Sequence, residues 1–369
     1  MKKKILALAL TVIMSLTLGQ ALFAADISLI IDGVQQRPDV APIVDNGTTL
    51  VPLRLISETL GADVSWDGAK QQATIETAGY TVVFTIDSAS YTVNGAAKSL
   101  PAGVAKLVDG RTMVPIRAFA ESIGAGVDYN ASANIASVNY FTMMTGTLKV
   151  NGSTTLQPIA QDAADKLMGM NNGLSIGVDG GGSGTGIKDA AAGTVNIGMS
   201  SRELTADELK ELKVFAVAND GIAVIVHPDN PITNLTKEQA AALFLGNTKN
   251  WADVGGATAP VMVQTRETGS GTRATLEEMI LNKESVVGTA TPYTSSALIK
   301  QAVAGDKNAI GFDSIGFVDS SVKAISLDGV AASSQTVIAG TYVMGRQLFC
   351  CTKGRPTGLA AMFIDYLKS

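Results

Sequence analysis

The sequence predicts an α/β protein of more than one domain, in which a small α+β domain precedes a larger two-lobed part. Its 369 residues exceed the usual size of one domain, so two or three domains are expected. From about residue 145 onward, strand-like runs alternate with helix-like runs, which favours open, mostly parallel sheets. Residues 27–141 instead contain an internal repeat of short strands around one helix.

The first 25 residues have the pattern of a secretory signal peptide. Three lysines precede an apolar run that starts at Ile5, and small residues follow up to Ala25. An uncleaved membrane anchor is the alternative interpretation. No cysteine follows the apolar run, so we do not expect attachment as a lipoprotein. The sequence therefore predicts an extracytoplasmic protein, either secreted or associated with the cell envelope.

Charge and residue usage exclude several classes of function. The chain has 28 basic and 33 acidic residues, a net charge of −5, which disfavours nucleic acid and anionic membrane surfaces as partners. The two cysteines, Cys350 and Cys351, are neighbours and form no disulfide framework; we expect them on opposite faces of one strand. The single histidine, His227, disfavours a zinc or histidine-based catalytic site, so no metal and no cofactor are expected.

Residues 49–54 (TLVPLR) recur as residues 112–117 (TMVPIR), 63 positions later. The same offset also relates residues further along each copy, which indicates two copies of one structural unit. These later matches are Glu58 with Glu121, Gly61 with Gly124, Val64 with Val127, and Trp66 with Tyr129.

Each copy predicts a turn, a strand, a helix and further strands. Asn46-Gly47 and Asp109-Gly110 are turn signals, the prolines suit helix starts, and Gly61 and Gly124 suit helix ends. The expected strands are 64–66, 73–76, 82–86, 127–129 and 136–140. Arg54 and Arg117 are expected to pair with the glutamates four residues on; binding a ligand is the alternative.

These LVPLR and MVPIR motifs, with the Gly-Ala, Val and aromatic residues that follow each, resemble the copper amine oxidase N-terminal-like domain. The resemblance covers about residues 28–140, within a predicted domain 26–141. Despite the family name, no copper site is expected here, because the region contains neither histidine nor cysteine. The resemblance implies a spacer or a module that contacts a cell-wall or surface component.

Three turns in the C-terminal part combine glycines with hydroxyl side chains between a predicted strand and a predicted helix. They are residues 151–155 (NGSTT), 179–186 (DGGGSGTG) and 266–272 (RETGSGT). Glycines let backbone N–H groups point inward, and a helix N-terminus offers unpaired donors. Arg266 adds a charged fork that suits a tetrahedral oxyanion. The turns predict an anion site; simple helix caps, or a flexible linker for the second turn, are the alternatives.

The predicted elements of this part alternate along the chain. Thr236 with Gln239 is typical of a capping box at a helix start. Open α/β sheets bind ligands at the carboxyl ends of their strands, and two facing lobes close by hinge motion. The expected strands are 146–150, 174–178, 195–199, 214–217, 222–227, 261–265, 309–313 and 336–344. The expected helices are 156–167, 187–192, 206–212, 236–245, 273–281, 296–303 and 357–367.

With the motifs GSTT (152–155), GGSGTG (181–186), IGMSSR (197–202) and RxxGSGT (266–272) in this order, residues 145–369 resemble the phosphate-binding component of the bacterial phosphate ABC transporter. The resemblance implies a periplasmic-binding-protein-like fold of two lobes joined by a hinge, with inorganic phosphate as ligand and ABC permease subunits as partners. Lobe I would span about 145–220 and 340–369, and lobe II about 222–337.

The resemblance also implies which residues hold phosphate. Contacts would come from Thr155 and the Leu156 amide in the first turn, and from Ser183 in the second. The third turn would contribute Arg266, Ser270, Gly271 and Thr272, and the implied set further includes Thr154, Gly184 and Ser201. Some members place an aspartate at the position of Ser201, where it accepts the proton of monohydrogen phosphate and rejects sulfate. Here Asp179 or Glu267 would have to supply that carboxylate.

Three functions stay open from the sequence. The first is a phosphate-binding protein that serves a permease. The second is a binding or sensing protein for another oxyanion, or a surface protein uncoupled from transport. The third is an enzyme such as a secreted phosphatase, which needs an activated nucleophile or metals. A single histidine and the absence of clustered carboxylates argue against an enzyme.

Overall fold

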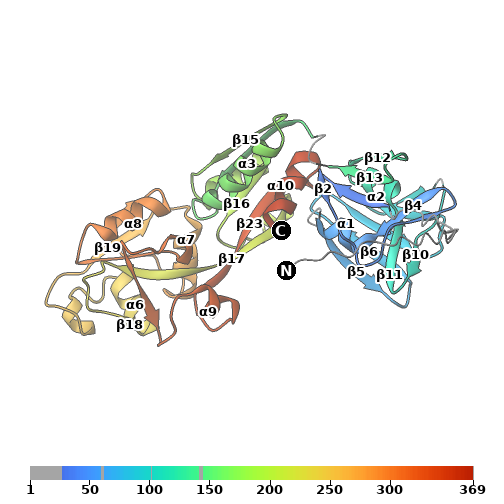
Figure 1. The fold of residues 1–369 in the computed structure, drawn as a ribbon. Helices are drawn as coiled ribbons and strands as arrows, with labels where there is room; N and C mark the ends of the chain where they lie inside the picture. The colour runs from blue at the N-terminus through green and yellow to red at the C-terminus, as the bar shows by residue number, and fades with distance from the viewer. Residues whose placement is uncertain (1–26, 60–61, 101, 141–143, 369) are drawn as a thin grey trace, which may run out of the picture.

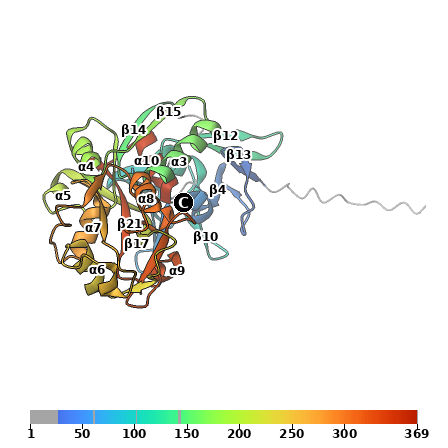
Figure 2. The ribbon, with the colours of Figure 1, turned by 90° about the vertical axis from the view of Figure 1, so that its left-hand side faces the viewer.

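The computed structural model describes residues 27–59, 62–100, 102–140 and 144–368. The predicted signal peptide therefore lies outside the described residues. Figure 1 shows an N-terminal domain beside a two-lobed part whose first lobe lies in the middle. Figure 2 looks from the second lobe toward the N-terminal domain. Among the described helices, none is long and apolar enough to cross a membrane.

The N-terminal domain consists of short strands in three sheets and two helices of similar length. The sheet orders are β12-β13-β1-β2, β10-β11-β4-β3 and β5-β6-β7-β8-β9. The elements are β1 (Ser28–Ile31), β2 (Val34–Gln35), β3 (Ile43–Asp45), β4 (Thr48–Pro52), α1 (Leu53–Thr59), β5 (Asp63–Asp67), β6 (Gln72–Glu76), β7 (Thr81–Thr85), β8 (Ser90–Val93), β9 (Ala96–Ser99), β10 (Lys106–Val108), β11 (Arg111–Pro115), α2 (Ile116–Ser122), β12 (Gly126–Asn130) and β13 (Ile135–Asn139).

The two repeats meet at an antiparallel pair of equivalent strands, β4 and β11. Val51 pairs with Val114, which is its own counterpart 63 positions later, and Pro52 and Leu50 pair with Met113 and Pro115. Exchanging the two repeats converts each of these pairings into another pairing of the same set. The register therefore corresponds to a local two-fold axis between the two valines. The predicted turns at Asn46-Gly47 and Asp109-Gly110 are confirmed, with all four residues at positive φ.

The first lobe is a mixed sheet in which β14 lies between parallel neighbours β15 and β16. Helices follow each of the parallel strands, as the alternating pattern predicts. The elements are β14 (Gly146–Gly152), α3 (Gln157–Met170), β15 (Leu174–Asp179), α4 (Ser183–Ala192), β16 (Ile197–Ser200), α5 (Glu208–Glu211), β23 (Gly345–Lys353) and α10 (Gly358–Lys368).

One long strand, β17 (Leu212–Val226), runs from the first lobe into the second (Figure 1). The prediction of two separate strands, 214–217 and 222–227, was wrong on this point. The polar residues between the two apolar runs stay in the strand because β23 supplies partners for them, including Arg346 opposite Asp220. A register shift between Ala216 and Ala218 marks a bulge in the pair. The strands β17 and β23 therefore form the connection between the lobes.

The second lobe surrounds a core of its own, formed by buried side chains from residues 222–344. The capping box of Thr236 with Gln239 is confirmed. Its further elements are β18 (Asn234–Leu235), α6 (Lys237–Phe244), β19 (Met262–Arg266), α7 (Gly271–Met279), β20 (Thr291–Tyr293), α8 (Ser296–Ala304), β21 (Ala309–Ser314), β22 (Lys323–Leu327) and α9 (Ser334–Ile338).

The predicted strand 336–344 was also wrong, because this stretch contains the end of helix α9. Ser333 caps that helix by accepting from the Thr336 N–H, while the Thr336 side chain returns to the Ser333 backbone. This local capping outweighs the strand preference of the β-branched residues that follow. The strand expected here begins later, as β23, which contains both cysteines. Cys350 and Cys351 are free and pack into different core clusters, so their predicted opposite orientation is confirmed.

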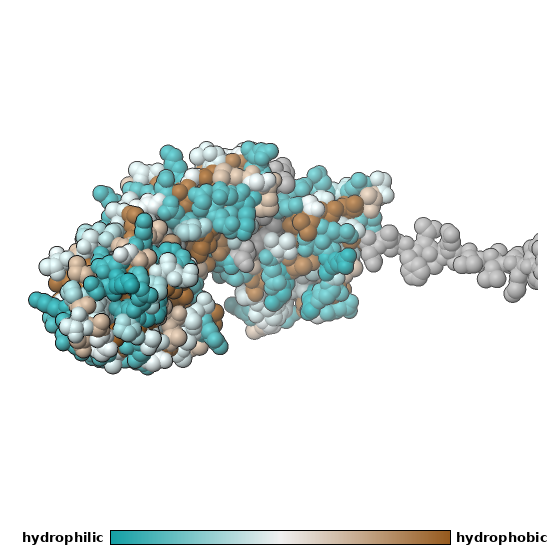
Figure 3. All heavy atoms as spheres, turned by 60° about the vertical axis from the view of Figure 1, so that its left-hand side comes forward, coloured by the Kyte–Doolittle hydropathy of each residue, from teal (hydrophilic) through white to brown (hydrophobic). Residues whose placement is uncertain are grey.

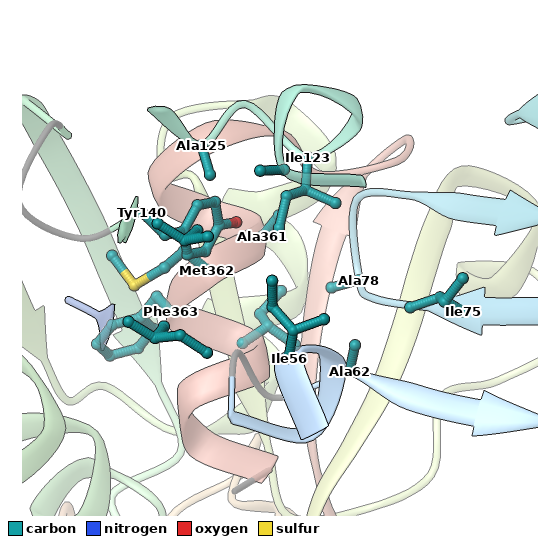
Figure 4. Close-up of a cluster of buried hydrophobic side chains, with 14 of the residues drawn as sticks. Ile56, Ala62, Ile75, Ala78, Ile123, Ala125, Tyr140, Ala361, Met362 and Phe363 are labelled. Atoms are coloured by element: carbon teal, nitrogen blue, oxygen red, sulfur yellow. The ribbon is translucent and has the colours of Figure 1, made fainter. Parts of the chain in front are cut away.

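The N-terminal domain packs against the last helix, α10, through one continuous apolar cluster. Ile56 and Ile123 of the repeats lie near Ala361, Met362 and Phe363 of α10 (Figure 4). At this contact the Asp365 carboxylate accepts a hydrogen bond from the Ala78 N–H at 2.9 Å. On the face that Figure 3 shows, polar and apolar side chains are interspersed.

Candidate functional site

The first turn connects β14 to α3 and presents two buried hydroxyls. Thr154 and Thr155 are at most 8% exposed. The N-cap residue of α3 is Leu156, which makes no side-chain capping bond, and its N–H donates to Ser153 Oγ at 3.3 Å. Ser153 therefore serves as a cap for the start of this helix, which leaves the two threonine hydroxyls free of that role.

The second turn connects β15 to α4, and its hydroxyl is shared with the end of β16. Ser183 Oγ accepts from the Ser201 N–H at 3.0 Å and lies 3.2 Å from Ser201 Oγ. The Gly184 N–H donates at 2.9 Å to the carbonyl of Gly269, which belongs to the other lobe. Helix α4 begins at Ser183 itself, with no side-chain capping bond at Gly182. The Gly-rich run is thus an ordered helix start and not a linker.

The third turn, between β19 and α7, lies directly against the first two. Thr272 Oγ1 is 3.1 Å from Thr155 Oγ1, and a Cβ added to Gly271 would lie 2.3 Å from Ser183 Oγ. A side chain at position 271 would therefore hold the lobes apart, and this steric limit explains why the position suits glycine. Ser270 has the simpler role, since its hydroxyl accepts from the Arg273 N–H as the cap of α7.

Arg266 ends β19 with its guanidinium buried between the lobes. Nη2 donates to Thr154 Oγ1 at 3.0 Å, and Nη1 donates to Ser296 Oγ at 3.2 Å. Two carbonyls, of Tyr293 and Thr294, accept the remaining bonds. Within the described part of the chain Arg266 has no ion pair, and burial lowers its pKa from the usual value. All hydrogen-bond partners of the Arg266 guanidinium are neutral, although the carboxylates of Asp313 and Glu267 lie near enough to raise its pKa. A buried cation with neutral hydrogen-bond partners favours an anion beside it.

A second buried arginine, which the sequence motifs did not identify, lies on the opposite strand of the hinge. Arg346 on β23 pairs with Asp220 on β17, with Nη2 2.7 Å and Nε 3.0 Å from Oδ2. Its Nη1 also donates to the Ser201 carbonyl at 2.9 Å. Its charge is therefore already balanced, in contrast to that of Arg266. It holds the end of β16 in place against the hinge.

Asp313, also missed as a site residue, is a buried carboxylate at the end of β21. The strands β19 and β21 pair in parallel through Met262–Ala309 and Val263–Ile310, so both run toward the same side, and Arg266 is near enough to Asp313 to affect its pKa. Its Oδ1 accepts from the Ser314 N–H, whereas Oδ2 is buried with no hydrogen-bond partner among the described residues. Burial raises the pKa of Asp313 to about 7, although the Ser296 hydroxyl, the Ser314 N–H and the nearby guanidiniums of Arg266 and Arg346 oppose this shift.

The two carboxylates that the sequence suggested for proton recognition differ in their position relative to Arg266, since only Glu267 is near enough to affect its pKa. Asp179 is exposed at the end of β15, and Glu267 is half-buried beside the second turn, near Gly182. Asp313 was detectable only as the last residue of a predicted strand, since parallel strands present their carboxyl ends to the ligand edge of a sheet.

The predicted residues thus converge where the lobes meet. Direct contacts join Thr154 with Arg266, Thr155 with Thr272, and Ser183 with Ser201. The side chain of Leu156 lies in the apolar core, so only its backbone could face a ligand. Cavities of about 670 and 580 Å³ flank this region on the two sides of the hinge strands. No cluster that could hold a metal occurs among the described residues. The arrangement suits binding of a tetrahedral oxyanion by hydroxyls and one guanidinium.

Comparison with known families divides the chain into two matches. Residues 139–369 match the PBP superfamily domain, and residues 30–138 match the copper amine oxidase N-terminal domain. The phosphate-binding protein PstS of Bacillus subtilis is 35% identical over 228 residues, which cover 61% of this chain and 76% of that protein.

Two solved structures are similar to the two-lobed part. One is a putative phosphate ABC transporter substrate-binding protein with bound phosphate from Clostridium perfringens: it is 35% identical, has a TM-score of 0.59, and the match covers 61% of this chain and 93% of that one. The other is an ABC-type phosphate transport receptor from Vibrio cholerae, 34% identical with a TM-score of 0.52, covering 60% and 93%.

Proposed function

Because the chain belongs to the PBP superfamily and, within it, to the family of the phosphate-binding proteins PstS, we propose that it binds inorganic phosphate between its two lobes. It then delivers the ion to the permease of an ABC transporter on the outer side of the membrane. The observation that carries this proposal is the buried guanidinium of Arg266, which lacks an ion pair in the described structure and lies among hydroxyls from both lobes. The names and bound ligand of the relatives support it.

The proposed phosphate ligands are the residues that the three turns contribute. Thr154, Thr155, Ser183 and Ser201 would act from the first lobe, and Arg266, Gly271 and Thr272 from the second. The Leu156 and Gly184 amides and Ser270 would complete the set. The hydroxyls, amides and guanidinium of this set now bond largely to one another or to nearby groups, so phosphate would replace some of these bonds. The lobe boundaries proposed are about 145–220 with 340–369, and about 222–337.

We also propose an extracytoplasmic location, a binding role without catalysis, and an attachment role for the N-terminal domain. The relatives named above are binding proteins, and hydroxyls without a positioned base or metal provide no hydrolytic chemistry. The N-terminal domain is firmly packed on α10, so a surface contact made by that domain would hold the lobes near the same surface.

Asp313 is proposed as the carboxylate that distinguishes phosphate from sulfate. Ser201 is neutral, whereas Asp313 has a buried oxygen with no hydrogen-bond partner among the described residues and is near enough to Arg266 to be affected by its charge. Monohydrogen phosphate can donate its proton to a carboxylate, whereas sulfate has no proton and would meet a repelling charge. This assignment replaces the candidates Asp179 and Glu267 of the sequence.

Thermal unfolding of the full protein with a panel of oxyanions tests these proposals. Phosphate at a hundred times its dissociation constant should stabilise the native state by about 2.7 kcal/mol, whereas sulfate and molybdate should have little effect. In Asp313→Asn the preference over sulfate should shrink, while Asp179→Asn and Glu267→Gln should keep it. Equal shifts for phosphate and sulfate in the wild type would favour a general oxyanion-binding protein. A release of product from a chromogenic phosphate ester would instead indicate an enzyme.

A further inference from the structure

The N-terminal domain carries two grooves that the phosphate site does not use. Their volumes are about 860 and 640 Å³. Most lining residues of one groove are the counterparts, 63 positions apart, of residues that line the other, as Arg54 and Trp66 correspond to Arg117 and Tyr129. We call them groove 1, which contains Trp66, and groove 2, which contains Tyr129.

The grooves arise from the two-fold relation of β4 and β11. Groove 1 lies between α1 and β5 of the first repeat and the turn after β10 of the second repeat. Groove 2 lies between α2 and β12 of the second repeat and the turn after β3 of the first. Each groove is therefore built by both repeats, and the central pair Val51–Val114 holds the two grooves in a fixed relation.

Exposed aromatic rings distinguish the grooves from the rest of the surface. Among the large apolar side chains that are well exposed in the described part of the chain, only two are aromatic, Trp66 (40%) and Tyr129 (46%). They occupy equivalent positions of the repeat and each lines its groove. Val44 of β3 and Leu107 of β10, also exposed and equivalent, line the opposite walls just before the turns. Solvent-exposed apolar groups gathered in a groove indicate a binding surface.

The same grooves also keep an exposed ion pair in both copies. The Arg54–Glu58 and Arg117–Glu121 pairs have N–O distances of 3.7 and 3.8 Å, so the predicted pairing is confirmed. Exposed pairs of this kind contribute only about 0.2–1 kcal/mol to stability. Packing explains why both repeats contain the same buried valines and prolines. It does not explain why both repeats also have an exposed Arg–Glu pair and an exposed aromatic residue at equivalent positions.

The charges outside this shared set differ between the grooves. Groove 1 adds two arginines and one aspartate, Arg37, Arg111 and Asp39, whereas groove 2 adds only Asp128. The formal charge is thus +1 in groove 1, from three arginines against Asp39 and Glu58, and −1 in groove 2, from Arg117 against Glu121 and Asp128. A ligand common to both grooves is recognised by the shared set, which has no net charge. That excludes strongly charged peptides and phosphate-rich polymers as the common ligand.

We propose that the two grooves bind neighbouring segments of a neutral glycan strand. Sugar rings would stack on the faces of Trp66 and Tyr129, since each ring offers a flat apolar surface. Hydroxyl or acetamido groups would bond to the arginine and glutamate of each pair, which together supply donors and acceptors. A polymer of identical units can occupy both grooves at once, and two weak sites on one rigid domain then act with raised effective concentration.

This inference rests on the attachment role proposed for the N-terminal domain and not on phosphate binding. Calorimetry of the full protein with the trimer of N-acetylglucosamine, a neutral β-linked probe, should give two sites per chain. Trp66→Ala and Tyr129→Ala should each leave one site with its affinity unchanged, and the double variant should have none. On the insoluble polymer of the same sugar, each single change should reduce retention at least about tenfold, because paired binding is lost.

Matched variants separate ring stacking from general damage. Trp66→Phe and Tyr129→Phe keep a ring and should keep both sites, and Val34→Ala removes an exposed apolar side chain outside both grooves and should change nothing. The phosphate-induced rise in melting temperature, measured for every variant, shows that the chain is folded and tests phosphate binding separately. No binding of the trimer at millimolar concentration, undiminished binding by the double variant, or binding only of wall-associated peptides would each overturn the glycan assignment.

Discussion

This molecule has two large internal contacts, and they differ in polarity. One lies between the lobes, and the other lies between the N-terminal domain and α10. The contact between the lobes is polar, with the buried charges of Arg266, Arg346, Asp220 and Asp313 and hydroxyls from both sides. The contact with α10 is an apolar cluster whose one buried charged group in the described residues is Asp365. Polar surfaces can return to water at little cost, whereas apolar surfaces cannot.

The difference indicates which contact moves. Lobes joined only by β17 and β23 and by hydrogen bonds can open, and the ligand then adds the interactions that close them. The N-terminal domain shares a continuous core with the first lobe, so we expect it to move with that lobe as one body. The following changes test whether stability resides in one contact and ligand affinity in the other.

The largest effect is expected from Phe363→Ala at the apolar contact. Phe363 is fully buried on α10 (Figure 4), and truncation of such a ring costs about 3–5 kcal/mol through lost burial and the cavity left behind. Denaturant unfolding should report this loss, while phosphate affinity of the folded variant should stay within about twofold. A large loss of affinity with little loss of stability would reverse the roles assigned to the two contacts.

Arg266→Ala at the polar contact should have the opposite profile. Two charge-assisted hydrogen bonds to the anion, each about 1.5–3 kcal/mol, would be lost, so calorimetry should show phosphate binding weakened by at least about 100-fold. Stability without ligand should hardly fall, because the variant also removes a buried charge that has no ion pair in the described structure. Arg266→Lys keeps the positive charge but loses the two-pronged guanidinium. Its phosphate affinity should therefore lie between those of the wild type and Arg266→Ala. An unchanged affinity would remove Arg266 from the site.

The residues of these two contacts differ in whether the sequence alone could predict them. Turns that combine glycines and hydroxyls have a local signature, so the three turns and Arg266 could be predicted from the sequence, and the family resemblance added Thr155 and Ser183 as candidate ligands. Arg346 and Asp220 have no such signature, since they face each other across two strands far apart in the chain. The stretch before Arg346 was moreover wrongly predicted as a strand, because its β-branched residues outweighed the capping pair Ser333 and Thr336 in that prediction.

The grooves of the N-terminal domain illustrate a second limit. The repeat and its ion pairs follow from the sequence offset, but the meeting of one repeat's helix with the other repeat's turn depends on the β4–β11 register. Nothing in one copy alone specifies that pairing. Asp313 was likewise visible only as a strand end, and its burial near Arg266 depends on how the parallel strands β19 and β21 pair.

The last expected effect is a change in the pH dependence of stability when Asp365 is replaced by Asn at the apolar contact. Burial raises the pKa of Asp365 from 3.8 to about 7, and the Ala78 N–H and Lys368 only partly oppose this. The folded chain therefore holds a proton that the unfolded chain has lost, so this carboxyl lowers stability progressively as pH rises from about 4 to about 7. Asp365→Asn keeps an oxygen for the Ala78 N–H and is always neutral, so its stability should decline less over that interval. Denaturant unfolding at about pH 4.5 and about pH 7.5 measures the difference, and Asp179→Asn, which alters an exposed carboxylate, is the control. Equal declines in wild type and Asp365→Asn would mean that the contact between the domain and α10 loosens enough in solution for water to reach this carboxyl.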